Sequence, residues 1–450
     1  MKILMINHFP LEGSGSGTYT RNLAVHLAAL GHEVTVVLPE NTDGFDRVEG
    51  VRLHPVYFLA AYDDGVPEEV RRAGSGNVPE DVMPGKNYPG DSMDMALPFN
   101  FPCFTTHPRS TVSFGGLTAE QLEIYKEAFS RAIDEEIERD CPDIIHGQHV
   151  WILSSLAAGK GIPIVLTAHG TDLMGYDKWP HLREYADRVM AECKAVISIS
   201  KDNCELIRER FPDAADKIVM MRNGYDPSVF YPEDDNREEV LAKYGIPADD
   251  LRGKKLVCFA GKLARFKGVD VLLDAEKKME EEGADTFTII VGDGEERESL
   301  QKQAEELGLK SVRFLGNVNM NALRKLYNIS DVSVVPSRRE PFGLVALEAM
   351  ACGVPVVASD QGGLPDFVND DVGALAEPED PEDLADKILI VLQRAGENAE
   401  KSADCTVTDS LDPGSIAKYA REHYAQDKII KELEDVYRKA VGDTSSGAEK

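Results

Sequence analysis

The sequence predicts an α/β protein made of two Rossmann-like, doubly wound domains that face each other across a cleft. Two observations indicate this fold class. Short apolar runs alternate with helical segments along the chain, and the alternation restarts after a polar linker. Near-continuous apolar runs are typical of parallel strands that are covered on both faces. Because ligands of such sheets bind beyond the carboxyl ends of the strands, two facing domains would share one site.

The first half of the chain supplies five of the apolar runs. The run at 2–7, KILMIN, is followed by a glycine-rich turn and a helical pattern through Leu23, Leu27 and Leu30. Gly31 is a suitable helix stop, and a second strand follows it. The later strands of this half are expected in the runs GHEVTVVL (31–38), DIIH (143–146), IPIVLTAH (162–169) and AVISIS (195–200).

The second half repeats the pattern after a linker rich in Pro, Asp and Tyr at 223–235. We expect the domain boundary between residues 224 and 236, which gives a first domain at 1–228 and a second at 229–424. A final helix at 425–441 and a disordered tail at 442–450 would follow. The strands of this half are expected in KKLVCFAG (254–261), TFTIIVGDG (286–294), SVRFLG (311–316), DVSVVPS (331–337) and VPVVAS (354–359), with a helix near 269–282.

Two segments interrupt the alternation. Residues 57–116 are rich in Pro, Gly and Asp and show little periodicity, and residues 395–413 form a shorter polar excursion. An irregular segment of the first kind is usually either a functional loop or disordered. Its aromatic residues and the step His107-Pro108-Arg109 favour a partly ordered loop.

Charge and cysteine content exclude several classes of function. The chain of 450 residues has 49 Lys and Arg against 79 Asp and Glu, a net charge of −30, which repels nucleic acid and anionic membranes. No run reaches the roughly 18–20 apolar residues of a membrane helix, and the N-terminus lacks the pattern of a secretory signal. The 7 scattered cysteines form no CxxC pair. We therefore expect a reduced, cytoplasmic protein without a metal site.

The segment at 339–363, REPFGLVALEAMACGVPVVASDQGG, is the most informative. A strand ends just before it and a helix is expected to begin near 341–343, where free backbone N–H groups can bind an anion. Glu340 lies at this turn and Glu348 follows eight residues later, between small apolar residues. An isolated pair would be a helix cap and a surface residue. A carboxylate partly buried among apolar residues, however, is costly unless a partner binds it.

This segment resembles the signature of retaining glycosyltransferases of family 4, which share the GT-B fold with glycogen synthase and sucrose-phosphate synthase. The resemblance covers roughly residues 1–56 and 118–440. It implies that Glu340 binds hydroxyls of the donor sugar and that Glu348 binds the ribose. The backbone amides of Phe342, Gly343 and Leu344 would contact sugar and diphosphate. It also implies that no metal is required, and that the final helix returns to the first domain.

A second candidate site is the basic loop GKLARFKG at 261–268, which directly follows an expected strand. Lys262, Arg265 and Lys267 would stabilise a departing diphosphate, whose negative charge grows as the glycosidic bond breaks. The family usually has Arg and then Lys in this loop. Lys262 occupies the Arg position as a point charge without a bidentate fork, and Arg265 could compensate. A solvated basic turn is the alternative interpretation.

Two further segments resemble donor contacts of the family. Gly15-Ser16 in the N-terminal glycine loop matches a Gly-Gly pair, with Ser in place of the second glycine. His169, at the end of an expected strand, matches a histidine near the donor sugar. His149 is a weaker outer contact and His146 is expected to pack in the core. The catalytic residues implied by the resemblance are His169, Lys267 and Glu340.

The predicted function is retaining transfer of a hexosyl group from a nucleotide sugar, UDP-hexose before GDP-hexose, to a small soluble acceptor. Front-face displacement in the cleft is expected because no carboxylate pair is placed as in hydrolases. Lys86, His107 and Arg109 in the insertion are candidate acceptor ligands. Alternatives are a sugar-nucleotide epimerase, a lipid- or polysaccharide-directed transferase, a non-catalytic sugar-nucleotide-binding protein, and a NAD-binding protein that uses the N-terminal glycines.

Overall fold

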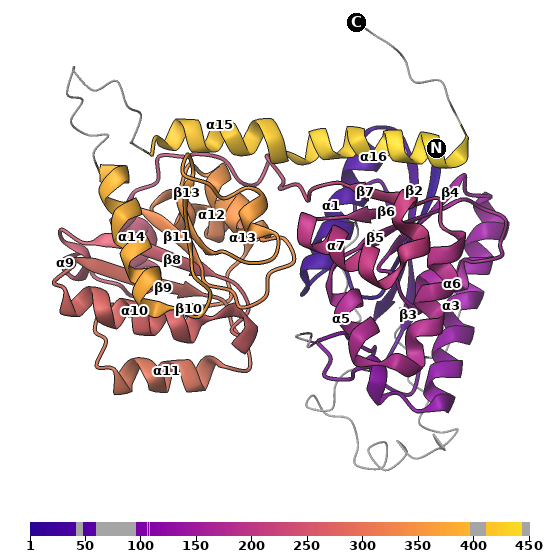
Figure 1. The fold of residues 1–450 in the computed structure, drawn as a ribbon, viewed down its shortest axis with the longest axis horizontal. Helices are drawn as coiled ribbons and strands as arrows, with labels where there is room; N and C mark the ends of the chain where they lie inside the picture. The colour runs from indigo at the N-terminus through magenta and orange to yellow at the C-terminus, as the bar shows by residue number, and fades with distance from the viewer. Residues whose placement is uncertain (42–47, 60–95, 106, 108, 397–410, 443–450) are drawn as a thin grey trace, which may run out of the picture. The chain divides into compact units, whose positions relative to one another are not determined.

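The computed structural model describes residues 1–41, 48–59, 96–105, 107, 109–396 and 411–442 (Figure 1). The chain divides into two compact units, each built on one parallel sheet. The first unit comprises Met1–Ile199, Asn203–Met221 and Ile430–Lys450, and the second comprises Ser200–Asp202 and Arg222–Ile429.

The sheet of the first unit has seven parallel strands in the order β3-β2-β1-β4-β5-β6-β7. Strand order runs outward from β1 in both directions, which is the doubly wound topology, and the switch point lies between β1 and β4. The strands are β1 (Lys2–Asn7), β2 (Glu33–Glu40), β3 (Val51–Tyr57), β4 (Ile144–Gln148), β5 (Ile164–Ala168), β6 (Ala195–Ser198) and β7 (Ile218–Met220).

Helices pack around this sheet (Figure 1). They are α1 (Gly15–Ala29), α3 (Ala119–Asp140), α4 (Ile152–Leu156), α5 (Thr171–Lys178), α6 (Arg183–Glu192) and α7 (Lys201–Arg210), with short 3-10 turns η2 (Phe114–Gly116), η3 (Pro180–Leu182) and η4 (Pro212–Lys217). The start of α3 is fixed by a capping box, in which the Thr118 side chain accepts from Gln121 N and the Gln121 side chain accepts from Thr118 N.

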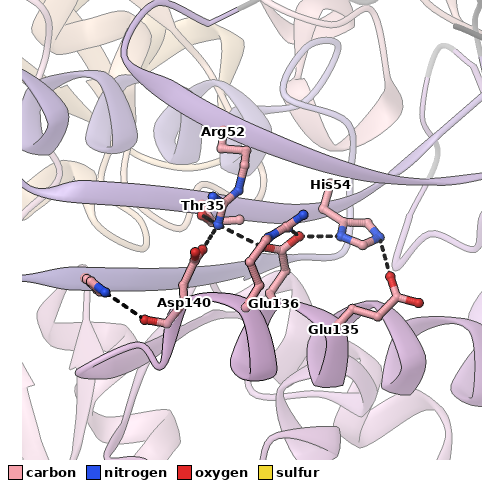
Figure 2. Close-up of polar contacts among 8 residues, drawn as sticks. Thr35, Arg52, His54, Glu135, Glu136 and Asp140 are labelled. Atoms are coloured by element: carbon pink, nitrogen blue, oxygen red, sulfur yellow. Dashed lines mark hydrogen bonds and ion pairs between the residues drawn. The ribbon is translucent and has the colours of Figure 1, made fainter. Parts of the chain in front are cut away.

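Charged side chains fasten α3 to the edge of this sheet, as Figure 2 shows. Arg52 on β3 points toward α3, donates to Glu136 at 2.8 Å, and also pairs with Asp140. His54 Nδ1 lies 2.5 Å from the other oxygen of Glu136. The Glu136 side chain is only 1% exposed, so these partners are what makes its burial tolerable.

The sheet of the second unit has six parallel strands in the order β10-β9-β8-β11-β12-β13. They are β8 (Lys255–Ala260), β9 (Thr286–Val291), β10 (Val312–Gly316), β11 (Val332–Val335), β12 (Val356–Ser359) and β13 (Gly373–Ala376). The helices and 3-10 turns are α8 (Arg237–Ala242), α9 (Ala248–Leu251), η5 (Arg265–Lys267), α10 (Val269–Glu281), α11 (Arg297–Glu306), α12 (Met320–Asn328), α13 (Leu344–Ala351), η6 (Leu364–Asp366), α14 (Pro381–Gly396), α15 (Pro413–Tyr424) and α16 (Gln426–Val441). Helix α16 begins in this unit, and its residues from Ile430 belong to the first.

The prediction of two doubly wound α/β domains is confirmed, and every predicted strand is present. Strands β3, β7 and β13 were not predicted, and all three lie at sheet edges. Strand β3 reads VRLHPVY, without the apolar run of a central strand, while β7 and β13 have only 3 and 4 residues. The final helix expected at 425–441 corresponds to α16, which begins at Gln426, and α15, which ends at Tyr424, is an additional helix before it.

The irregular segment at 57–116 is described only in part. Its described residues bury Phe99, Phe101, Phe104 and Phe114 in the core of the first unit. Much of the polar excursion and of the tail lies outside the described residues. Across the parts of the chain that the structure describes, no helix is both long and apolar enough to span a bilayer.

Candidate active site

The second unit brings Lys267 and Glu340 together at the carboxyl end of its sheet. Lys267 Nζ lies 2.6 Å from Glu340 Oε2, with side-chain exposures of 19% and 9%. Gly268 makes this approach possible, because it has a φ of 68° and a Cβ there would lie 1.9 Å from Pro336 O. The 3-10 turn η5 can therefore pack directly against the residue that follows β11.

Glu340 is held by both its backbone and its side chain. Its carbonyl oxygen accepts from Gly363 N at 3.0 Å, and the Ser337 hydroxyl lies 3.4 Å from Oε2. The carboxylate therefore has a fixed position beside a cation. Such a group can accept hydrogen bonds from sugar hydroxyls, while the ammonium group neutralises an adjacent anion.

The other two basic residues of the loop are placed differently. Lys262 Nζ lies 3.3 Å from Glu295 Oε2, whose side chain is 48% exposed. Arg265 has an exposed side chain, and its carbonyl oxygen accepts from Arg338 Nη1 at 2.8 Å. Arg338 also forms a bidentate pair with Asp270, at 2.7 and 2.8 Å. Arg338 thus holds the backbone of the loop at Arg265, and Lys267 is the basic residue of the loop that contacts Glu340.

Helix α13 begins four residues after Glu340, so its amino end lies close in sequence to the Lys267–Glu340 pair. Its cap is Gly343, with a φ of 105°, and a Cβ there would lie 2.5 Å from Leu364 Cδ2. The first intrahelical donor is Ala346 N, which bonds to Gly343 O at 3.0 Å. The amides of Gly343 and Leu344 precede it, and such amides form a ready anion site. The predicted start near 341–343 is thus shifted slightly, and Phe342 is buried against Phe367.

Glu348 lies on the same helix, one turn beyond its start, and is half-buried. Burial raises the pKa of this carboxyl from 4.5 to about 8. The group is therefore protonated over much of the neutral range in the free protein, and it can both donate and accept a hydrogen bond. Paired hydroxyls, as on a ribose, are suitable partners for such a group.

In the first unit, Gly15 and Ser16 form the start of α1. The Ser14 hydroxyl accepts from Gly17 N at 3.0 Å, and Thr18 N bonds to Ser14 O at 3.0 Å. The amides of Gly15 and Ser16 precede both donors, so they are available to an anion. Gly17 is the residue that the turn requires, because a Cβ there would lie 2.2 Å from Pro10 O.

His169 lies on the same edge of this sheet, directly after β5. Its ring packs edge-on against Tyr19 of α1, with centroids 5.2 Å apart, and its residue exposure is 7%. Nε2 lies 3.1 Å from Gln148 Oε1. Burial lowers the pKa of His169 to about 3, so the imidazole is neutral at physiological pH. It can act as a hydrogen-bonding group but not as a fixed cation.

Two other histidines occupy equivalent places. His8 follows β1 and His149 follows β4, and β1, β4 and β5 are neighbours in the sheet. The ring centroids of His8 and His149 are 5.2 Å apart, and those of His149 and His169 are 4.8 Å apart. Sequence reasoning missed His8. The available signal was a histidine immediately after each of three strands, but it can be recognised only once the strand order is known.

The sequence also matches models of known protein families. A profile described as "Glycosyl transferases group 1" matches residues 246–406, and one described as "Glycosyltransferase Family 4" matches residues 108–229. The D-inositol 3-phosphate glycosyltransferase of Salinispora tropica is 32% identical over 370 residues, which cover 75% of this chain and 73% of that protein. The chain belongs to glycosyltransferase family 4. The resemblance inferred from the glutamate motif is confirmed.

Solved structures place this glycosyltransferase in the GT-B fold. Sucrose-phosphate synthase from Thermosynechococcus elongatus has a TM-score of 0.68 at 20% identity, covering 97% of this chain and 98% of that one. The Anabaena protein HepE, in complex with UDP and glucose, has a TM-score of 0.67 at 17% identity, covering 98% and 100%. At these identities the likeness shows the fold alone.

The predicted acceptor ligands of the glycosyltransferase have structural contacts. His107 Nδ1 accepts from Arg109 N at 3.1 Å, so Nε2 carries the proton and lies 3.1 Å from Glu12 O. Arg109 pairs with Glu40, whose side chain is 2% exposed, at 2.5 Å. An acceptor anion would have to compete with Glu40 for Arg109. Lys86 lies outside the described residues.

Proposed function

We propose that this glycosyltransferase transfers a hexosyl group from a nucleoside diphosphate sugar, UDP-hexose, to a hydroxyl of a small acceptor, with retention of configuration. The observation that supports this most is the Lys267–Glu340 pair beside the open amino end of α13, with half-buried Glu348 on the same helix. Lys267 and the amino end of α13 suit a diphosphate, Glu340 suits the hydroxyls of a hexose, and Glu348 suits a ribose.

Donor binding uses groups of the second unit. The ribose hydroxyls bind Glu348, and the diphosphate lies at the amides of Gly343 and Leu344 with Lys267 and Lys262 as counter-charges. Arg265, which has an exposed side chain, adds positive charge at the same loop. Glu340 accepts hydrogen bonds from hydroxyls of the hexose and keeps Lys267 oriented between carboxylate and phosphate.

The first unit also carries groups that suit a nucleoside diphosphate sugar. The amides of Gly15 and Ser16 suit a diphosphate, and His169 suits a hydroxyl of the hexose. Because the pKa of His169 is lowered to about 3 by burial, this contact is one between neutral groups.

The reaction is a front-face displacement. The bond between the anomeric carbon and the diphosphate oxygen breaks while the acceptor oxygen bonds to the same face of that carbon. The acceptor proton passes to the departing diphosphate, which leaves as the nucleoside diphosphate. Charge develops on the diphosphate in the transition state, where Lys267 and the α13 amides are already in place to stabilise it. The proposal requires no metal ion.

The choice of donor and acceptor rests on two relatives and on charge. HepE was solved with UDP and glucose, and the Salinispora relative is named for an inositol phosphate acceptor. A net charge of −30 disfavours docking on anionic membranes. We therefore favour a uridine donor and a small acceptor that need not be presented at a membrane surface.

The test is an acceptor-dependent transfer assay with purified protein. UDP-glucose, GDP-mannose and ADP-glucose are each incubated with inositol phosphate, sugar phosphates and free sugars, with and without EDTA, and released nucleotide is measured. The anomeric coupling of the product, read by proton NMR, reports retention. Tight NADH binding without binding of any nucleotide sugar would overturn the proposal, and an inverted product would overturn its mechanism.

A further inference from the structure

A buried polar chain runs through the first unit to His169. The Tyr437 hydroxyl on α16 lies 2.6 Å from His146 Nδ1, and the Gln148 amide nitrogen lies 3.3 Å from the same atom. The other end of the Gln148 amide, Oε1, lies 3.1 Å from His169 Nε2. Gln148 therefore joins the two histidines, and Tyr437 lies at the far end of the chain.

For the orientation that the Gln148 amide has in the structure, these contacts define where the protons lie. His146 Nδ1 accepts from the Gln148 amide, so its proton is on Nε2, which donates to Thr167 Oγ1 at 2.8 Å. Nδ1 has one lone pair, and the Tyr437 hydroxyl at 2.6 Å and the Gln148 amide at 3.3 Å share it as donors. With its N–H₂ group directed at His146, Gln148 presents its carbonyl oxygen to His169. Because a carbonyl oxygen can only accept, His169 must carry its proton on Nε2.

This arrangement leaves His169 Nδ1 as an unprotonated nitrogen. No group among the residues that the structure describes is bonded to it. His169 is 7% exposed, whereas His8, His146 and His149 are each at 0%, so His169 is the histidine of the four that solvent or substrate can reach.

We propose that Gln148, anchored by His146 and Tyr437, is a positioning residue that holds His169 as its Nε2–H tautomer and so presents Nδ1 to a hydroxyl of the transferred hexose. The inference deepens the proposed function and, in its last step, rests on it. Without Gln148, the two tautomers of a neutral imidazole would interconvert, and the fraction with a free Nδ1 lone pair would fall.

The position of Tyr437 makes this series of hydrogen bonds depend on the last helix. Tyr437 is fully buried and lies 291 residues beyond His146 in the sequence, on the last helix. The orientation of the Gln148 amide therefore depends on the final helix being packed against the first unit. Loss of the Tyr437 hydroxyl would loosen His146 first and the orientation of Gln148 second.

Histidine NMR tests the tautomer without any substrate. Full-length protein labelled with ¹⁵N-histidine is examined by long-range proton–nitrogen correlation, which distinguishes the two tautomers, and His169 is assigned by its loss in His169→Asn. Wild type should show the Nε2–H pattern. Gln148→Met, which keeps the volume but removes the amide, should show a mixed pattern. Tyr437→Phe, the milder variant, should show a partial shift.

Kinetics follow on the same proteins, with UDP-glucose hydrolysis or transfer as the readout and UDP binding as the control. Gln148→Met should lower kcat about tenfold or more and leave the Kd of UDP unchanged. Ser155→Ala removes a buried hydroxyl that donates within its own turn, to Ile152 O at 2.6 Å, and should change neither the tautomer nor kcat.

The outcomes separate the two proposals. An Nδ1–H pattern in wild type, or an unchanged pattern in both variants, overturns the role of Gln148. If Gln148→Met does not fold, Tyr437→Phe decides by the same criterion. The expected tautomers without turnover of any nucleotide sugar would retain the Gln148–His169 assignment and reject the proposed function. Turnover by a wild type with the Nδ1–H pattern would do the reverse.

Discussion

At the scale of the residue, the Lys267–Glu340 contact is the feature that most directly links structure to chemistry. Two oppositely charged side chains with low exposure, 2.6 Å apart, stabilise each other before substrate arrives. We predict that Lys267→Met lowers kcat by about 100-fold or more, because a preorganised charge on the leaving group is lost. Lys262→Met is the matched change in the same loop, and its effect should be about tenfold, because Lys262 pairs with the more exposed Glu295.

Steady-state kinetics with the donor found in the transfer assay measures both variants, and circular dichroism checks their fold. Equal losses in the two would show that the Glu340 contact is not what distinguishes Lys267. Unchanged kcat in Lys267→Met would remove Lys267 from the site.

Glu348 provides a residue-scale prediction in pH. Its folded-state pKa of about 8 lies above the ordinary 4.5, so the native state binds the proton more tightly than the unfolded chain. Its contribution to the free energy of unfolding is therefore complete below about pH 4.5 and is lost as pH rises toward 8. Glu348→Gln lacks this titration and should gain in Tm relative to wild type between pH 5 and 8, by about 2–4 °C for each kcal/mol.

Thermal melts of both proteins at a series of pH values measure this difference. Parallel Tm profiles for Glu348→Gln and wild type would contradict the assignment. Glu382→Gln, at an exposed position on α14, is the control and should give no such divergence.

At the scale of the element, helix α13 depends on a glycine that no other residue can replace without strain. Gly343 has a φ of 105°, and a Cβ would lie 2.5 Å from Leu364. We predict that Gly343→Ala destabilises the fold by about 1–3 kcal/mol and weakens UDP binding, since the amides at the helix start would move. Gly396→Ala, at the end of α14 with nothing within 4 Å, should be neutral or slightly stabilising.

Urea unfolding and UDP titration measure the two effects. Normal UDP affinity in a destabilised Gly343→Ala protein would separate the glycine's structural role from anion binding. Similar behaviour of both alanine variants would argue against strain at Gly343.

A second element, α3, is attached to the sheet through charge as well as apolar packing. Arg52 bonds to Glu136 and Thr35, and Glu136 is almost fully buried. Arg52→Met would leave that carboxylate with His54 and Arg139, and we predict a loss of about 1–3 kcal/mol in the free energy of unfolding. Arg252→Met removes an ion pair between two groups that are each 84% exposed and should change stability very little. Equal urea midpoints for the two variants would contradict the prediction.

At the scale of the whole molecule, the fold could be predicted because alternating apolar runs repeat throughout the chain. The candidate donor site could be proposed from sequence because its glutamate motif is contiguous. The edge strands could not be predicted. Strand β3, for example, carries Arg52, His54 and Pro55 and therefore lacks an apolar run. The contact between Lys267 and Glu340, which lie 73 residues apart, could not be predicted either, nor could the link from Tyr437 to His146. Such contacts depend on strand order and on how each turn packs, which no local pattern contains.

The net charge of −30 gives the prediction that belongs to the molecule as a whole. Like charges spread over the surface repel each other most in the compact state, and salt screens them over about 10 Å at 0.1 M but about 3 Å at 1 M. We therefore predict that Tm rises as NaCl increases from 0.05 to 1 M. The same screening weakens the attraction between the donor diphosphate and Lys267, so under the proposed function donor affinity should fall over the range in which stability rises. Sucrose, which is uncharged, should raise Tm without weakening UDP binding. A Tm that is flat or falls with NaCl would mean that local ion pairs outweigh the global repulsion.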